Sequence, residues 1–184
     1  PIIVGGSGFS ILPERILQYL EADYGIFGGG EEVLPLLVKY VFQGEGDIHQ
    51  IPHLVYQQGD IIRRNPCLPY QKRLPQVKRG YLDYHLYFRP GFENFPGFAS
   101  VETKRGCPHS CIYCVEPEIK GQKVRIKDPE DVSKEIDWFV EKGISYFFLA
   151  DSEFNTDCDA ALSLLKYWKV KEYSRKIKWI AYAT

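Results

Sequence analysis

Short apolar runs alternate with longer amphipathic stretches along the chain. Near the N-terminus, an apolar run at residues 1–4 ends in glycines and precedes a helix predicted over about residues 12–21. A second apolar run at residues 24–27 precedes an apolar helix over about residues 33–42. Strand, helix, strand, helix in this order predicts a layer of parallel strands covered by helices.

The same rhythm returns in the C-terminal half. Apolar runs predict strands at residues 97–103, 145–150 and 178–183. Between the first two, an Asp-Pro pair favours a helix start, so a helix is expected over about residues 128–142, with glycine ending it. A further helix is expected to reach about Trp168 before the third strand.

Residues 44–96 separate these two regions and differ from both. Prolines and charges are scattered through them, and a polar turn at residues 57–60 predicts a hairpin. The basic residues of this stretch are broken up by prolines, which favours a solvated connection over a nucleic-acid patch. We therefore expect a first domain portion at 1–43, an interdomain linker at 44–96 and a second domain portion at 97–184.

Composition excludes several classes of protein. The 184 residues are 45% hydrophobic with a formal net charge of -1, which is typical of a globular protein and gives no electrostatic footprint for nucleic acid. No apolar run approaches the ~20 residues that span a bilayer. No signal peptide is visible, and five cysteines do not form a secreted disulfide framework. We expect a cytoplasmic protein with no membrane and no nucleic-acid partner.

Three of the five cysteines, Cys107, Cys111 and Cys114, lie within eight residues, directly after the first strand of the second region. Thiolates this close on one loop can converge on one iron-sulfur cluster. Zinc is the first alternative, although it usually needs four ligands and only His109 is near enough to complete the set. A redox dithiol is the second alternative, and it leaves Cys107 without a role.

The segment from Glu102 to Cys114 resembles the cluster loop of radical S-adenosylmethionine (SAM) enzymes. The resemblance implies a [4Fe-4S] cluster on the three cysteines, with one open iron that binds the amino and carboxylate groups of SAM. It also implies that Tyr113 contacts the adenine of SAM; the alternative is an ordinary packed tyrosine.

A polar cluster, Asp151-Ser152-Glu153, follows the second strand of this region. In radical SAM enzymes side chains at this place meet the methionyl amino group and the ribose of SAM. The resemblance therefore implies that Asp151, Ser152 and Glu153 contact SAM, with a carboxylate pairing with the ammonium. Helix capping is the alternative for these residues.

The N-terminal region, with the order V-G-G, L-P-E, D-Y-G-I-F-G-G-G-E-E, resembles the last third of the cobalamin-binding domain in the B12-binding class of radical SAM proteins. The resemblance implies that Gly5 and Gly6 let the backbone pass close to the corrin tail, and that Gly28, Gly29 and Gly30 line the same side. A glycine-rich turn with no ligand is the alternative.

The resemblance implies an α/β protein in which the C-terminal part of a Rossmann-like cobalamin-binding domain precedes the first half of a radical SAM barrel. Its expected activity is cleavage of SAM to a 5′-deoxyadenosyl radical, used for cobalamin-dependent methyl transfer or related radical chemistry. A small-molecule or peptide substrate and an external electron donor are the expected partners. The alternatives are a tRNA-modifying radical SAM enzyme and a non-catalytic iron-sulfur or zinc protein. As half a barrel, the chain alone is expected not to turn over.

Overall fold

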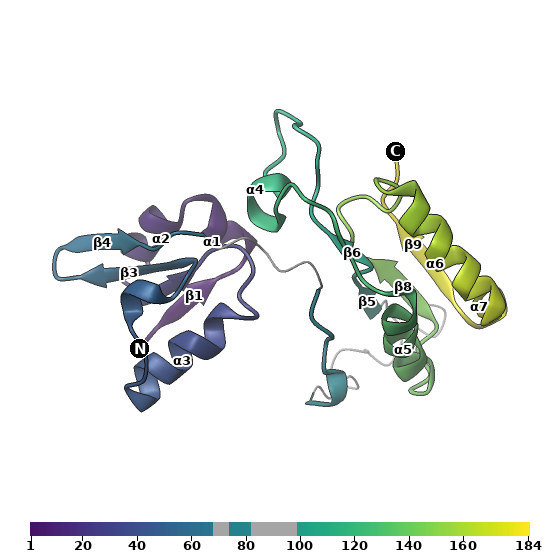
Figure 1. Ribbon diagram of the computed structural model, residues 1–184, viewed down its shortest axis with the longest axis horizontal. Coiled ribbons are helices and arrows are strands. Elements are labelled where there is room, and N and C mark those ends of the chain that lie inside the picture. The colour runs from purple at the N-terminus through teal and green to yellow at the C-terminus, as the bar shows by residue number, and fades with distance from the viewer. Residues whose placement is uncertain (68–73, 82–98) are drawn as a thin grey trace, which may run out of the picture. The chain divides into compact units, whose positions relative to one another are not determined.

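The computed structural model describes residues 1–67, 74–81 and 99–184 (Figure 1). The chain divides into two compact units. The first contains Pro1–Gln71 and Pro108–Gln122, and the second contains Lys72–Cys107 and Lys123–Thr184.

A four-stranded sheet organises the first unit, in the order β1-β2-β3-β4. Its strands are β1 (Ile3–Gly5), β2 (Tyr24–Ile26), β3 (Leu54–Gln58) and β4 (Ile61–Arg64). The parallel pairing of β1 with β2 confirms the parallel layer that the sequence predicts. The hairpin is also present, since β3 and β4 pair antiparallel around residues 59 and 60.

The hairpin forms at the predicted residues, but its position in the fold differs from the expectation. Residues 54–64 were expected in a linker, but β3 pairs antiparallel with β2 and extends the sheet. This pairing satisfies the backbone groups on the second edge of β2 and buries Leu54, Val55 and Tyr56. The sheet of the first unit is therefore mixed.

Four helices belong to the first unit within the described residues, and a 3-10 turn at Ile48–Gln50 precedes β3. The four helices are α1 (Ser7–Ile11), α2 (Pro13–Tyr19), α3 (Val33–Gln43) and α4 (Glu116–Lys120). The sequence predicts α2 and α3, whereas the short α1 and α4 were not expected. Two buried clusters form the core of this unit, one of Phe9, Leu17, Ala22, Phe27 and Val55, and one of Ile26, Val33, Leu37, Ile51, Leu54 and Tyr56.

Helix α1 packs closely on the sheet because β2 has a glycine beneath it. The ring of Phe9 occupies the place where a side chain at Gly25 would lie, so that an added Cβ would be 2.0 Å from Cζ of Phe9. Only glycine allows this approach.

The second unit contains a three-stranded parallel sheet in the order β5-β8-β9 and a separate two-stranded ribbon, β6-β7. The strands are β5 (Ala99–Val101), β8 (Tyr146–Leu149), β9 (Lys178–Ala181), β6 (Lys104–Arg105) and β7 (Arg125–Ile126). The three parallel strands confirm the β/α rhythm of the sequence. Residues 97 and 98, which were expected to begin the first strand, lie outside the described residues.

Helices α5 (Pro129–Val140), α6 (Cys158–Val170) and α7 (Tyr173–Lys176) complete the second unit. The predicted start of α5 is confirmed, because the Asp128 side chain accepts a hydrogen bond from the amide of Glu130 at 2.8 Å. Gly143 follows the helix with a positive φ of 81°.

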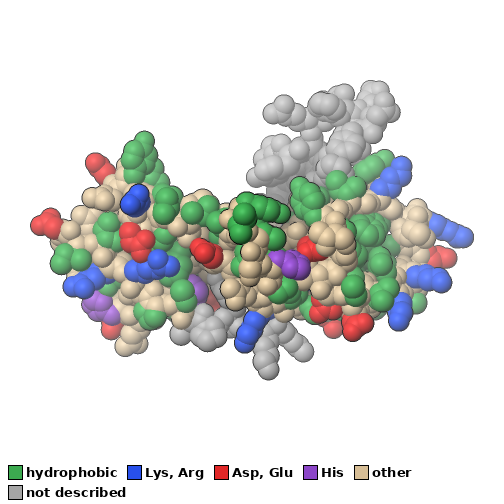
Figure 2. Space-filling view, turned by 90° about the horizontal axis from the view of Figure 1, so that it is seen from above, with side chains coloured by type: hydrophobic (Ala, Val, Ile, Leu, Met, Phe, Trp, Pro, Cys, Tyr) green, Lys and Arg blue, Asp and Glu red, His purple; other side chains and the backbone are tan. Residues whose placement is uncertain are grey.

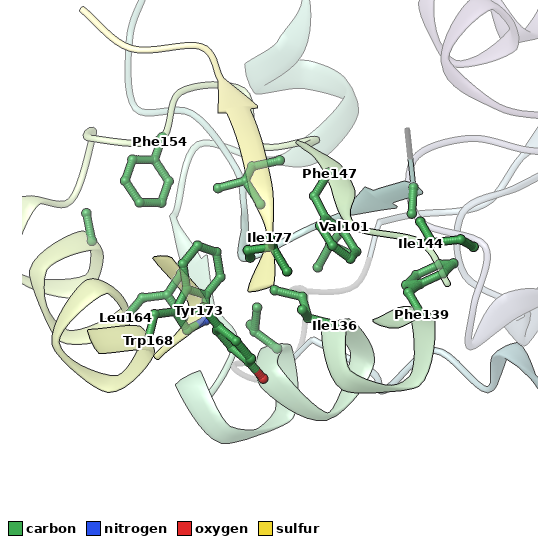
Figure 3. Close-up of a cluster of buried hydrophobic side chains, with 14 residues drawn as sticks. Val101, Ile136, Phe139, Ile144, Phe147, Phe154, Leu164, Trp168, Tyr173 and Ile177 are labelled. Carbon is green, nitrogen blue, oxygen red and sulfur yellow. The ribbon is translucent and has the colours of Figure 1, made fainter. Parts of the chain in front are cut away.

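The core of the second unit lies between these helices and the parallel sheet (Figure 3). It contains Ala99, Val101, Val132, Ile136, Phe139, Ile144, Phe147, Leu149, Phe154, Ala161, Leu164, Trp168, Tyr173 and Ile177. Tyr173 also ties α7 to α5, because its hydroxyl donates to Asp137 Oδ1 at 2.7 Å and contacts the carbonyl of Ser133 at 3.1 Å.

The segment 74–81, which ends in a 3-10 turn at Arg79–Tyr81, is held against α5. Arg79 donates through Nε to Glu135 at 2.7 Å, and its guanidinium lies 4.7 Å from the centre of the Phe139 ring. Lys127 pairs with the other oxygen of Glu135 at 3.2 Å. One buried carboxylate therefore anchors two cations, and we call this group the α5 clamp.

Candidate functional site

The carboxyl ends of β5, β8 and β9 lie at one edge of the sheet. Val101 is in register with Leu149, and Leu149 is in register with Ala181, so the residues that follow all three strands emerge together. Ligands of parallel α/β sheets bind at this edge. The cysteine loop follows β5 through β6, and the predicted SAM-contacting residues follow β8.

The cysteine loop leaves β6 through Gly106, whose φ of 108° favours glycine. Cys107 is buried, Cys114 is half-buried and Cys111 is exposed. The amide of Cys114 donates to the carbonyl of Cys111 at 3.1 Å and closes a turn. The loop therefore has one cysteine at its buried base and two around a turn nearer to solvent.

The donor set fits an iron-sulfur cluster in its chemistry, because all three cysteines are free thiols and clusters are held by thiolates. Among the described residues, no three side chains of His, Cys, Asp or Glu lie close enough together to hold a metal ion. The convergence of the three thiols therefore remains a prediction from their spacing. Cys67 and Cys158 are also free and exposed.

Tyr113 lies between the last two cysteines and is 86% exposed. An ordinary packed tyrosine is therefore not what the structure shows. Its ring is available to a flat ligand, and aromatic rings of this kind stack on adenine. The adenine contact itself remains a prediction.

Asp151 is 3% exposed and faces the residues that lead into the cysteine loop. Its Oδ1 accepts from the amides of Thr103 at 2.7 Å and Lys104 at 3.1 Å, and its Oδ2 accepts from the Thr103 hydroxyl at 2.5 Å. Burial raises the pKa of the Asp151 carboxyl above its ordinary value, and these hydrogen bonds act in the opposite direction.

Glu153 has different surroundings. Its Oε2 accepts from the Thr156 hydroxyl at 3.1 Å, and its Oε1 accepts from the hydroxyl of Thr184 after β9. The same two loops are joined by Asn155, whose side chain binds the backbone of Thr184 in both directions. Glu153 thus lies where the segments after β8 and β9 meet.

Capping does not account for this cluster. The N-cap of α6 is Asp157, whose side chain accepts from the amide of Ala160 at 2.9 Å. The alternative of helix capping is therefore wrong for Asp151 and Glu153. Ser152 is half-buried beside them.

The two glycine turns of the first unit lie together, at the carboxyl ends of the parallel strands β1 and β2. Ser10 joins them, because its hydroxyl donates to the carbonyl of Gly6 at 2.8 Å and accepts from the amide of Gly28 at 2.9 Å. Gly6 and Gly28 have positive φ angles of 90° and 74°. Their backbone conformation therefore favours glycine at both turns.

The remaining glycines of the prediction have smaller steric roles. A Cβ at Gly5 would lie 3.1 Å from the carbonyl of Ile26, which is tight, whereas a Cβ at Gly30 would make an ordinary contact at 3.7 Å. Gly29 is half-buried in the second turn. Sequence reasoning missed Ser10, although a serine four residues after a glycine at a helix start can bond back to its carbonyl.

Residues 101–182 match the model of the Radical SAM superfamily. The chain is 24% identical over 216 residues to the Tryptophan 2-C-methyltransferase of Streptomyces laurentii, covering 90% of this chain and 35% of that protein. It is 33% identical over 164 residues to the Cobalamin-dependent radical SAM methyltransferase TokK of Streptomyces tokunonensis, covering 84% of this chain and 24% of TokK.

A solved structure is similar over almost the whole chain. The radical SAM methyltransferase TsrM from Kitasatospora setae, solved with cobalamin and a [4Fe-4S] cluster bound, superposes with a TM-score of 0.82 at 25% identity and covers 97% of this chain and 36% of TsrM. The segment 101–182 belongs to the radical SAM superfamily. Within it, the chain is similar to the cobalamin-dependent methyltransferases, of whose length it spans about a third or less.

Proposed function

We propose that this chain is part of a cobalamin-dependent radical SAM enzyme that transfers a methyl group or carries out related radical chemistry. The observation that carries the proposal is that β5, which precedes the cysteine loop, and β8, which precedes Glu153, end at the same edge of a parallel sheet. The similarity to TsrM and TokK supports the same activity.

The proposed cluster would be held by the thiolates of Cys107, Cys111 and Cys114. When bound, the cluster would pass on an electron from the external donor, which would split SAM at its sulfur–C5′ bond into methionine and the 5′-deoxyadenosyl radical, and cobalamin would supply the methyl group. Tyr113 would stack on the adenine, and Glu153, with Ser152 beside it, would bind the ammonium of SAM by charge.

The proposed cobalamin contact is the pair of turns that Ser10 joins. Gly5, Gly6 and Gly28 would keep the backbone free of side chains, so that the tail of the cofactor can lie against it, and Gly29 and Gly30 would line the same side. Residues 1–43 are the proposed cobalamin-domain portion and residues 97–184 the proposed barrel portion. Of the stretch 44–96 between them, the β3–β4 hairpin belongs to the sheet of the first unit and not to a linker.

The proposed substrate is a small molecule or a peptide, and an external donor supplies the electron. The name of the relative from Streptomyces laurentii specifies tryptophan as its substrate, which supports a small molecule. On the face in Figure 2, positive and negative side chains are interspersed, whereas a tRNA substrate would favour a continuous basic surface.

Within the described ranges, no helix has both the length and the hydrophobicity that crossing a bilayer requires. We place the protein in the cytoplasm. The support is its five free cysteines, since reducing compartments keep thiols reduced.

Anaerobic reconstitution of the full-length protein tests the proposal. Iron and sulfide per chain and the electron paramagnetic resonance spectrum of the reduced protein are measured with and without SAM. Replacement of Cys107, Cys111 or Cys114 by alanine should abolish cluster loading, whereas Cys67→Ala and Cys158→Ala should leave it unchanged. Zinc in place of iron, or equal iron loss from Cys67→Ala, would contradict the assignment.

A further inference from the structure

Two buried side chains, Asp151 and Lys104, connect the base of the cysteine loop to the loop that contains Glu153. Asp151 comes directly after the β8 region and accepts three hydrogen bonds from Thr103 and Lys104. Thr103 lies four residues before Cys107. The end of one strand thus fixes the backbone from which the cysteine loop departs.

Lys104 makes a second connection in the opposite direction, from the base of the cysteine loop to the loop of Glu153. Its ammonium donates to the carbonyl of Phe154, the residue after Glu153, and lies 5.2 Å from the centre of the Phe154 ring. Lys104 is 3% exposed, although lysine is seldom buried without a partner. The acidic groups that face it are Asp151, Asp157 and Glu153, together with the thiol of Cys158.

The rest of the base is also fixed. The carbonyl of Thr103 accepts from the amide of Lys127 at 2.9 Å, and β6 pairs with β7 through Lys104 and Arg105. Thr103 therefore has its amide, hydroxyl and carbonyl all bonded. The backbone at Thr103 is thus held by Asp151 on one side and by Lys127 on the other, four residues before Cys107.

The hydrogen bonds of Asp151 argue against a SAM contact by this residue. A carboxylate has about four acceptor positions, and three of them are used inside the protein. An ammonium would have to reach a carboxylate that is 97% buried, given its exposure of 3%. Glu153, two residues further on, is also buried at 9% exposure, but its carboxylate oxygens accept from hydroxyl groups, which an ammonium could replace.

We propose that Asp151 and Lys104 form a reciprocal latch between the two loops, in which Asp151 positions the base of the cysteine loop and Lys104 positions the loop of Glu153. Asp151 is then a positioning residue for the cluster, and SAM binding by charge belongs to Glu153. The division of roles rests on the proposed function, whereas the latch itself rests on the contacts above.

The test compares Asp151→Asn with Asp151→Ala in the full-length protein. Asparagine keeps an acceptor for the two amides and loses the charge, whereas alanine leaves two buried amides without an acceptor. A latch predicts that asparagine retains iron loading and SAM affinity within about threefold, and that alanine loses at least about tenfold in both. A charge contact to SAM predicts instead that the two variants lose SAM affinity equally.

Hydrogen exchange of the Thr103 and Lys104 amides supplies a readout that needs no cluster. It is measured before and after reconstitution, and exchange in the alanine variant should be at least about tenfold faster than in the wild type. Should Asp151→Ala not fold, Thr103→Val removes the hydroxyl bond alone and Thr103→Ser restores it. Asp159→Asn, an exposed acidic residue of α6, is the matched control and should change nothing.

Two results would overturn the latch: unchanged exchange in both Asp151→Ala and Thr103→Val, or loss of SAM affinity in Asp151→Asn as large as in Asp151→Ala. Glu153→Gln should lose SAM affinity while iron loading persists. Failure of the wild-type protein to assemble any cluster would refute the proposed function instead, and the exchange data would still decide the latch.

Discussion

Gly25 offers a sharp test of how the first unit is packed. It lies on β2 beneath α1, and an added Cβ would come within 2.0 Å of Cζ of Phe9 and within 2.8 Å of two further ring atoms. Carbon atoms in contact normally lie about 3.5–4.0 Å apart, so the ring would have to move by more than about 1 Å. Phe9 is buried among Leu17, Phe27 and Val55, which leaves it little room.

We expect Gly25→Ala to destabilise the first unit by about 1–3 kcal/mol, the usual cost of overpacking a core. Phe9→Ala alone should cost about 3–5 kcal/mol, because it empties the same space. In the Phe9→Ala background the added methyl group fits that space, so Gly25→Ala should then cost close to nothing. The double-mutant cycle should therefore show a coupling of about 1–3 kcal/mol.

Hydrogen exchange of the β2 amides is the suitable assay, because all three tryptophans, Trp138, Trp168 and Trp179, lie in the second unit. Exchange in Gly25→Ala should be about five- to 140-fold faster than in the wild type. Gly8→Ala is the control, since no heavy atom lies within 4 Å of its Cβ. An equal cost of Gly25→Ala in both backgrounds would refute the steric reasoning.

Three further predictions concern the hydrogen bonds of the Tyr173 and Ser10 hydroxyl groups and the carboxylate of the α5 clamp. Burial raises the pKa of the Tyr173 hydroxyl above its usual 10.0, so the stability that this group contributes to the fold is present below pH 10 and is lost as pH rises further. Tyr173→Phe should lower the free energy of unfolding in urea by about 1.5–3 kcal/mol at pH 8, and the variant should lose less stability above pH 10 than the wild type. Ser10→Ala should speed exchange of the Gly28 amide and weaken cobalamin binding about two- to tenfold, as measured by absorbance titration of the full-length protein. Glu135→Gln should cost about 3–5 kcal/mol in thermal or urea unfolding because it removes the negative charge that pairs with buried Lys127 and half-buried Arg79, whereas Glu130→Gln, in an exposed pair, should cost less than about 1 kcal/mol.

The order and type of most elements could be predicted from the sequence because they depend on local signals. The cap at Asp128 and the glycine after α5 are examples, since each acts within one turn of the helix. The attachment of β3 to β2 could not be predicted in this way. A hairpin is encoded by its own turn, but the edge to which it adds depends on which strand has unpaired backbone groups.

The candidate site also has features that the sequence predicts and features that depend on distant partners. The spacing of the cysteines and the polar cluster after β8 indicated the site residues themselves. What these residues bond to was not predictable, because Asp151 and Thr103 are 48 residues apart and Ser10 and Gly28 are 18 apart. A carboxylate that could bind a ligand and one that fixes a backbone look alike in sequence.

The α5 clamp has a consequence for synthesis of the chain on the ribosome. Arg79 and Glu135 are separated by 56 residues, and Gln76 contacts Asp131 across 55. At about 5–20 residues per second, the partner of Arg79 is made about 3–11 s after Arg79 itself. After the segment 74–81 emerges from the ribosome, it has no helix to dock on for an interval of this length, so it is exposed to proteases and chaperones in the nascent chain until α5 has emerged as well.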